Sequence, residues 1–109
     1  MENRRTRRFN LQLPLAITRS GAERVAFAGY TNNISSSGVL FTTESEPDLG
    51  GPIEYIITLN REGAQAINLR CMGKILRSDR FPVDDRNTSY QIAATLERYE
   101  FVRDRAMTQ

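Results

Sequence analysis

Alternation of apolar and polar residues with a period of two is the feature that most limits what this chain can fold into. Successive side chains of a β-strand point to opposite faces, so this pattern predicts half-buried strands rather than helices. Gly, Pro, Asn and Ser separate the alternating segments, as expected for turns. The predicted strands cover residues 11–17, 24–32, 38–42, 52–60, 66–79 and 89–97. The sequence therefore predicts an all-β protein.

The connections between these segments refine the prediction. Ser20–Glu23 is typical of a hairpin turn, and Pro14 indicates that the first strand lies at an edge or carries a bulge. Residues 80–88 are polar and predict a mobile loop, whereas the mixed charges of 98–107 predict a short C-terminal α-helix. We expect a small six-stranded antiparallel β-barrel with that helix, because closure removes exposed strand edges.

The composition excludes several classes of function. A chain of 109 residues is large enough for one domain, and no apolar run approaches the roughly 20 residues needed to cross a membrane. With no histidine and a single cysteine, Cys71, the usual nucleophile–base pairs and metal sites cannot be assembled. We expect neither an enzyme nor a cofactor or metal. A lone cysteine also suits a reducing cytoplasm, where we expect the protein to reside.

Positive charge is concentrated at the N-terminus. Residues 1–8 hold four arginines and one glutamate, so the rest of the chain carries a net charge of −1 out of a total of +2. Proteins that coat nucleic acid usually spread basic residues over a whole face. Lys74 is the only lysine among 15 basic residues, and arginine favours planar, bidentate recognition. The distribution favours a small anionic ligand over nucleic acid.

The arginine cluster is predicted to form a flexible ligand-binding arm over residues 1–10, with the barrel and helix over 11–109. Arg4 and Arg8 each carry a planar fork of donors that matches phosphate oxygens or a guanine edge. In an extended arm they lie on the same side, roughly 13 Å apart. The alternative is a solvated basic tail without a ligand.

A second segment, Asn33-Ile34-Ser35-Ser36-Ser37-Gly38, joins the second and third predicted strands. Asn33 and Ser35 are alternate residues, so they face the same side of a strand-like stretch. Gly38 can adopt a positive φ and allow a close approach of ligand or backbone. The alternative is an ordinary polar turn, since Asn, Ser and Gly are common turn residues.

Together, Arg4-x-x-x-Arg8 and Asn33-x-Ser35-x-x-Gly38 resemble the paired motifs of the PilZ domain family. That family combines an Arg-x-x-x-Arg arm with an Asp/Asn-x-Ser-x-x-Gly motif on a small β-barrel. The resemblance implies a bacterial receptor for the second messenger cyclic di-GMP. It implies that Arg4 and Arg8 contact guanine edges and phosphates, that Asn33 and Ser35 hydrogen-bond guanine, and that Gly38 permits a close turn.

Other residues are candidates for secondary roles. Arg5, Arg7, Ser36 and Ser37 are candidate secondary ligand contacts. Arg70, Lys74 and Arg77 are expected to be solvated, with one of them as a candidate phosphate contact.

We therefore expect a stand-alone cyclic di-GMP receptor or adaptor that acts on an unidentified downstream protein. One alternative is a PilZ-like protein-interaction adaptor that binds no nucleotide. A weaker alternative is a barrel that binds single-stranded nucleic acid through its basic arm.

Overall fold

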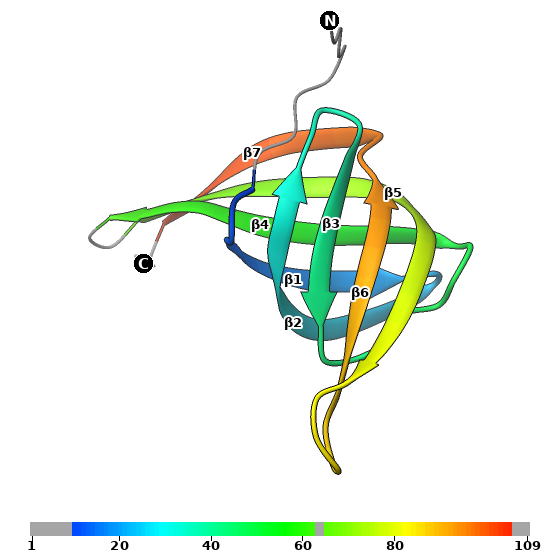
Figure 1. Cartoon of the computed structure of the whole chain (residues 1–109). Coiled ribbons are helices and arrows are strands. Elements are labelled where there is room, and N and C mark those ends of the chain that lie inside the picture. Colours follow the sequence, from blue (N-terminus) through cyan, green and yellow to red (C-terminus); the bar gives the residue numbers. More distant parts are fainter. Residues whose placement is uncertain (1–9, 63–64, 106–109) are drawn as a thin grey trace, which may run out of the picture.

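A closed barrel of antiparallel strands, with a further strand paired to one of them, makes up the protein (Figure 1). The computed structural model describes residues 10–62 and 65–105. The strands are β1 (Pro14–Ser20), β2 (Glu23–Ile34), β3 (Gly38–Thr43), β4 (Pro52–Glu62), β5 (Gln65–Pro82), β6 (Thr88–Thr95) and β7 (Arg98–Arg105).

The length of β5 allows the barrel to close. The strands follow the order β4-β1-β2-β3-β6-β5, and β5 also pairs with β4. Residues Gln65–Lys74 of this 18-residue strand pair with β4, and its second half, from Ile75, pairs with β6. All of these pairings are antiparallel. The predicted six-stranded antiparallel barrel is confirmed.

Alternate residues of the strands fill the barrel, as the period-two pattern predicts. The rings of Phe41 and Tyr55, both fully buried, pack with centroids 5.6 Å apart and their planes tilted by 36°. The Tyr55 hydroxyl donates to the Thr95 carbonyl at 3.1 Å, so its one polar group is satisfied. Burial raises the pKa of Tyr55, and it raises the pKa of the Cys71 thiol to about 12. The buried residues of the hydrophobic core are Leu15, Ile17, Val39, Phe41, Ile53, Tyr55, Ile57, Cys71, Ile75, Ile92 and Ala94.

The first hairpin follows the sequence prediction closely. Ser20 pairs with Glu23, and Gly21 between them has a φ of 63°, which favours glycine. Pro14 is the first residue of β1, where a missing N–H is tolerated, and a bulge lies between Ile17 and Arg19. The strand thus begins at Pro14 rather than at residue 11.

The predicted C-terminal helix over 98–107 is wrong. Residues 98–105 form β7, which pairs antiparallel with the first half of β5, and none of the described residues is helical. None of them therefore forms a membrane-spanning helix. Without β7 this half of β5 would be an open edge, and pairing to such an edge overrides a weak local preference. Glu100 also accepts a hydrogen bond from Arg70 on β5 at 3.0 Å.

The prediction of a mobile loop over residues 80–88 is also wrong for residues 80–82 and 88, which belong to β5 and β6. Pro82 of β5 pairs with Thr88 of β6, so the two strands form a hairpin that extends from the barrel (Figure 1). Inside its turn, the Asp84 carboxylate accepts the backbone N–H of Arg86 at 2.8 Å and that of Asn87 at 2.9 Å. These bonds and those from the Asn87 side chain lower the pKa of Asp84.

Candidate ligand-binding site

The turn between β2 and β3 is held by the side chain of Ser35. Its hydroxyl oxygen accepts the backbone N–H of Ser37 at 3.3 Å and that of Gly38 at 3.2 Å. The backbone N–H of Ser35 in turn donates to the Gly38 carbonyl at 2.9 Å. Such local side-chain-to-backbone bonds fix the conformation of a turn before any ligand is present.

A β-bulge directs Asn33 outward. Thr31 pairs with Phe41, but the next aligned pair is Asn33 with Leu40, so β2 carries one extra residue. Strict alternation would place Asn33 on the buried face that Thr31 occupies. The bulge moves Asn33 to the outer face, on the same side as Leu40. The extra residue, Asn32, accepts a hydrogen bond from the Thr42 hydroxyl at 2.9 Å.

Gly38 is required for close packing rather than for an unusual φ. Its φ is not positive, in contrast to the expectation from the sequence, since Gly21 and Gly50 are the positive-φ glycines of the described residues. It pairs with Thr95 of β6, and a Cβ at this position would lie 2.9 Å from the Ala94 carbonyl oxygen. A side chain here would push β3 away from β6.

These residues share one cavity of about 460 Å³ on the outer surface of the barrel. That volume lies within the roughly 300–1,000 Å³ range of small-molecule sites. Ser37 also contributes, whereas Ser36 is exposed outside the lining. The cavity is lined by Asn33, Ser35, Ser37, Gly38, Val39, Leu40, Leu76, Arg77, Ala93 and Ala94.

A second bulge forms the opposite wall of the cavity. Ile75 pairs with Ala94 and Arg77 pairs with Ala93, so Leu76 is the extra residue of β5. Ile75 is buried, and the bulge leaves both Leu76 and Arg77 on the outer face. Leu76 is 70% exposed, more than any other large hydrophobic residue described. Of this wall, the sequence indicated only Arg77, as one of three candidate phosphate contacts. The bulge itself could not be predicted, because it depends on the register with a partner strand.

Arg77 brings a positive charge to the cavity wall. Its Nε lies 3.1 Å from an Asp79 carboxylate oxygen, and both side chains are largely exposed. An ion pair this exposed to water is weak and exchanges easily for another anion. Arg77 can therefore turn its guanidinium toward a phosphate in the cavity.

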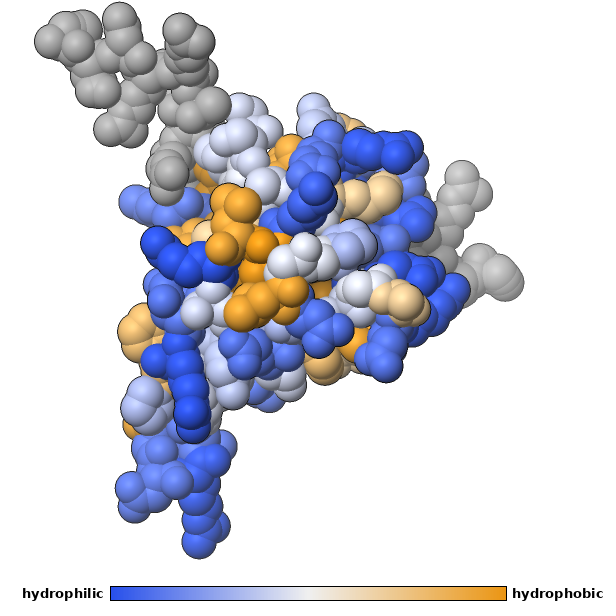
Figure 2. Space-filling view, turned by 90° about the vertical axis from the view of Figure 1, so that its right-hand side faces the viewer, coloured by the Kyte–Doolittle hydropathy of each residue, from blue (hydrophilic) through white to orange (hydrophobic). Residues whose placement is uncertain are grey.

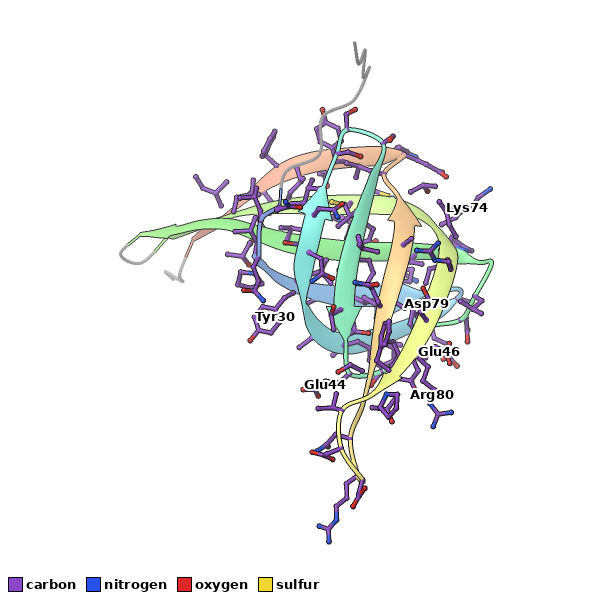
Figure 3. The ribbon with its side chains drawn as sticks, viewed as in Figure 1. Tyr30, Glu44, Glu46, Lys74, Asp79 and Arg80 are labelled. Carbon is purple, nitrogen blue, oxygen red and sulfur yellow. The ribbon has the colours of Figure 1, made fainter. Side chains whose placement is uncertain are left out.

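Arg70 and Lys74, the other two candidate phosphate contacts on β5, are directed elsewhere. Arg70 is paired with Glu54 at 3.2 Å and with Glu100 at 3.0 Å, which joins β4, β5 and β7. These partners raise the pKa of Arg70. Lys74 points away from the barrel into solvent (Figure 3). Arg77 alone of these three candidates lines the cavity.

The surface of the molecule combines small apolar groups with polar side chains. Figure 2 shows a small group of hydrophobic side chains at the centre of one face, enclosed by hydrophilic ones. The cavity has the same mixed character, since Leu40, Leu76 and Ala93 lie beside Asn33 and Arg77. An apolar wall with a few polar groups suits a planar heterocycle with hydrogen-bonding edges.

Thr31 fastens the start of the described chain next to the site. Its hydroxyl donates to the Leu11 carbonyl and accepts the Leu13 N–H at 2.9 Å, and its own N–H donates to the Leu13 carbonyl at 2.9 Å. Thr31 is completely buried and lies two residues before Asn33. Residues 11–13 are thus tied down near the cavity.

The predicted arm residues Arg4, Arg5, Arg7 and Arg8 lie outside the described residues. Arg8 is three residues from Leu11, a span of at most about 11 Å for an extended chain. Thr31 and Asn33 are separated by roughly 7 Å along β2. The chain length therefore permits Arg8 to reach the cavity, and its role stays a prediction. Among the described residues no group of acidic, His or Cys side chains could hold a metal ion.

The described residues thus combine a small closed antiparallel barrel with a preformed polar turn beside an outer cavity. The family comparison agrees: the PilZ domain model matches residues 2–99, and the chain belongs to the PilZ domain family. Members of this family bind cyclic di-GMP and partner proteins. Neither the curated proteins nor the solved structures contain a significant match to the chain.

Proposed function

We propose that this protein is a stand-alone cytoplasmic receptor for cyclic di-GMP that acts by binding and carries out no catalysis. The observation that supports it best is the convergence of Asn33, Ser35 and Gly38 on one cavity. These are the three defined positions of the second PilZ motif. The ligand requires no metal or cofactor in this proposal.

The cavity offers chemistry that suits a guanine base. The Asn33 side-chain amide can both donate and accept hydrogen bonds, so it complements an edge of guanine that carries donors and acceptors. The Ser35 hydroxyl is held by its turn at a fixed position, which reduces the entropy lost on binding. Leu40, Leu76 and Ala93 provide an apolar surface against which the ring can lie.

Arginines complete the proposed site. Arg4 and Arg8 supply the guanidinium groups for phosphates and guanine edges, with Arg5 and Arg7 as secondary contacts. Arg77 adds a charge from the opposite wall of the cavity. Ser37 lines the cavity and remains a candidate contact, whereas Ser36 faces solvent and is a weaker one.

Closure of the arm gives the receptor a signal to transmit. Ordering residues 1–10 over the ligand costs conformational entropy that the arginine contacts must exceed. The closed arm and the barrel together then form a surface that exists only with ligand bound. A downstream protein that recognises this surface responds to the messenger.

Isothermal titration with cyclic di-GMP tests the proposal and gives the number of ligands per chain. We expect saturable binding that Arg8→Ala and Ser35→Ala reduce at least tenfold, which corresponds to about 1.4 kcal/mol for each. Arg24→Ala is the control for charge, because Arg24 is exposed at the far end of β2 from the cavity. Absence of binding at high-micromolar ligand would contradict the proposal and favour the nucleotide-independent adaptor. If Arg8→Ala binds cyclic di-GMP as tightly as the Arg24→Ala control does, the role of the arm is contradicted.

A further inference from the structure

The outer edge of β7 is open among the residues that the structure describes. β7 is the last strand in the sheet order, and it pairs with β5 alone. Figure 1 shows it at the margin of the sheet, next to β5. An unpaired edge of 8 residues presents a row of backbone donors and acceptors that another strand can use.

Two aromatic side chains stand on this edge strand without cover from the described residues. Tyr99 is 58% and Phe101 is 68% exposed, and their rings meet edge-to-face at 6.2 Å. In register, Tyr99 lies opposite the fully buried Cys71 and Phe101 lies opposite Leu69. The two aromatic residues therefore continue the inner, apolar face of the barrel beyond its closed part. Exposed apolar surface of this kind marks an interaction site more often than an isolated hydrophobic residue does.

Most of this edge lies outside the part of the chain that the family shares. The PilZ match ends at residue 99, whereas β7 continues to Arg105. The edge is therefore a feature that membership of the family does not account for.

The charge order of β7 is complementary to itself in one register. When two identical strands pair antiparallel about a two-fold axis, one residue lies opposite its own copy. With Phe101 at the axis, Arg98 lies opposite position 104, an aspartate. This opposite-charge pair occurs twice, and the two Phe101 residues meet at the centre.

Neighbouring registers are unfavourable. With residue 100 at the axis, Glu100 faces its own copy. With residue 102 at the axis, Glu100 faces the aspartate at position 104. Like charges directly opposite each other destabilise a strand pair, so the register centred on Phe101 is favoured over both of its neighbours.

We propose that the partner of this edge is a second copy of the chain, and that the two β7 strands pair antiparallel with Phe101 at the two-fold axis. The pairing joins the two β5–β7 sheets into one continuous sheet. It brings the two Phe101 residues together, and it places Tyr99 of each copy opposite position 103, an arginine, of the other. The association does not depend on a ligand, so it stands or falls separately from the cyclic di-GMP site.

Disulfide formation in the full-length chain tests the register. In the proposed pair the two copies of residue 101 have Cα atoms about 4.5–5.5 Å apart, within the range that a disulfide spans. Phe101→Cys is therefore expected to form a covalent dimer on mild oxidation. Tyr99→Cys is the matched control, because its two copies lie four positions apart, roughly 13 Å, and should stay unlinked. Cys71 is fully buried and does not compete.

Sedimentation equilibrium of charge variants tests the complementarity without adding a cysteine. Arg98→Asp and Asp104→Arg should each weaken dimerisation at least about tenfold, and the double variant should recover the original affinity. Arg24→Asp, far from β7, is the control and should leave the affinity unchanged. A monomer at every concentration up to millimolar would overturn the proposal. It would also be overturned by a dimer that resists both single variants, or by equal crosslinking of Tyr99→Cys and Phe101→Cys.

Discussion

The Thr31 hydroxyl is predicted to control ligand affinity without touching the ligand. Thr31→Val replaces the hydroxyl of this completely buried side chain by a methyl group of similar size, so the loss of the hydrogen bonds is the main effect. It removes the bond to the Leu11 carbonyl and the bond from the Leu13 N–H. The backbone bond from Thr31 N–H to the Leu13 carbonyl remains.

The magnitude follows from the two backbone groups that lose their partner. Each unsatisfied group costs about 1–3 kcal/mol when it stays away from water. Both groups are only partly buried, and water can reach them if residues 11–13 detach. We therefore expect a total loss of about 1–3 kcal/mol, half of the sum for two groups that stay fully away from water. If ligand binding must restore this attachment, the affinity falls by about fivefold to a hundredfold.

Two measurements on the same samples separate anchoring from general destabilisation. Urea unfolding gives the change in stability, and isothermal titration with cyclic di-GMP gives the change in affinity. Thr43→Val is the matched control: Thr43 is 1% exposed and donates to the Ser45 carbonyl at 2.7 Å, and it does not line the site cavity. It should lose stability and keep its affinity. Unchanged affinity in Thr31→Val, or an equal loss in Thr43→Val, would refute the reasoning.

Three further predictions follow from the site and the core. Gly38→Ala should destabilise the barrel by about 1–3 kcal/mol in urea unfolding, because its Cβ would meet the Ala94 carbonyl oxygen at 2.9 Å; a neutral result would mean that β3 and β6 separate easily. Arg77→Ala should weaken cyclic di-GMP binding several-fold, whereas Lys74→Ala should leave the affinity unchanged. Identical isothermal titration curves for the two variants would show that Arg77 does not contact the ligand. Burial raises the pKa of Cys71 from 9.0 to about 12, so the folded protein binds a proton that the unfolded chain releases. This contribution to stability is present below pH 9.0 and is lost as the pH rises toward 12. The urea midpoint of Cys71→Ala should therefore fall less over that pH range than the midpoint of the unsubstituted protein. An identical fall in the two proteins would contradict this prediction.

The six strands of the barrel were accessible from the sequence because each depends on a local period-two pattern. Ile53, Tyr55 and Ile57 alternate with outward-facing residues, and all three are buried in the structure. The segment between β2 and β3 was also recognisable, since Ser35 closes its turn with residues two and three positions away. Such features need no knowledge of distant partners.

The C-terminal strand was missed for the opposite reason. Residues 98–105 carry both a period-two apolar pattern and mixed charges, which do not distinguish a helix from a strand. Their conformation is set by the open edge of β5, and Glu100 meets Arg70 from a distance of 30 residues along the chain. No local propensity contains that information.

The sequence by itself determined that this chain forms a small antiparallel barrel with a polar Asn33–Gly38 turn, because strand periodicity and turn chemistry act over a few residues. The tertiary structure decided which side chains line the cavity. Bulges in β2 and β5 turn Asn33 and Arg77 to the outer face, and the close approach of β6 explains why residue 38 is glycine. Each of these depends on the register between strands far apart in the sequence, which is fixed only when the barrel closes.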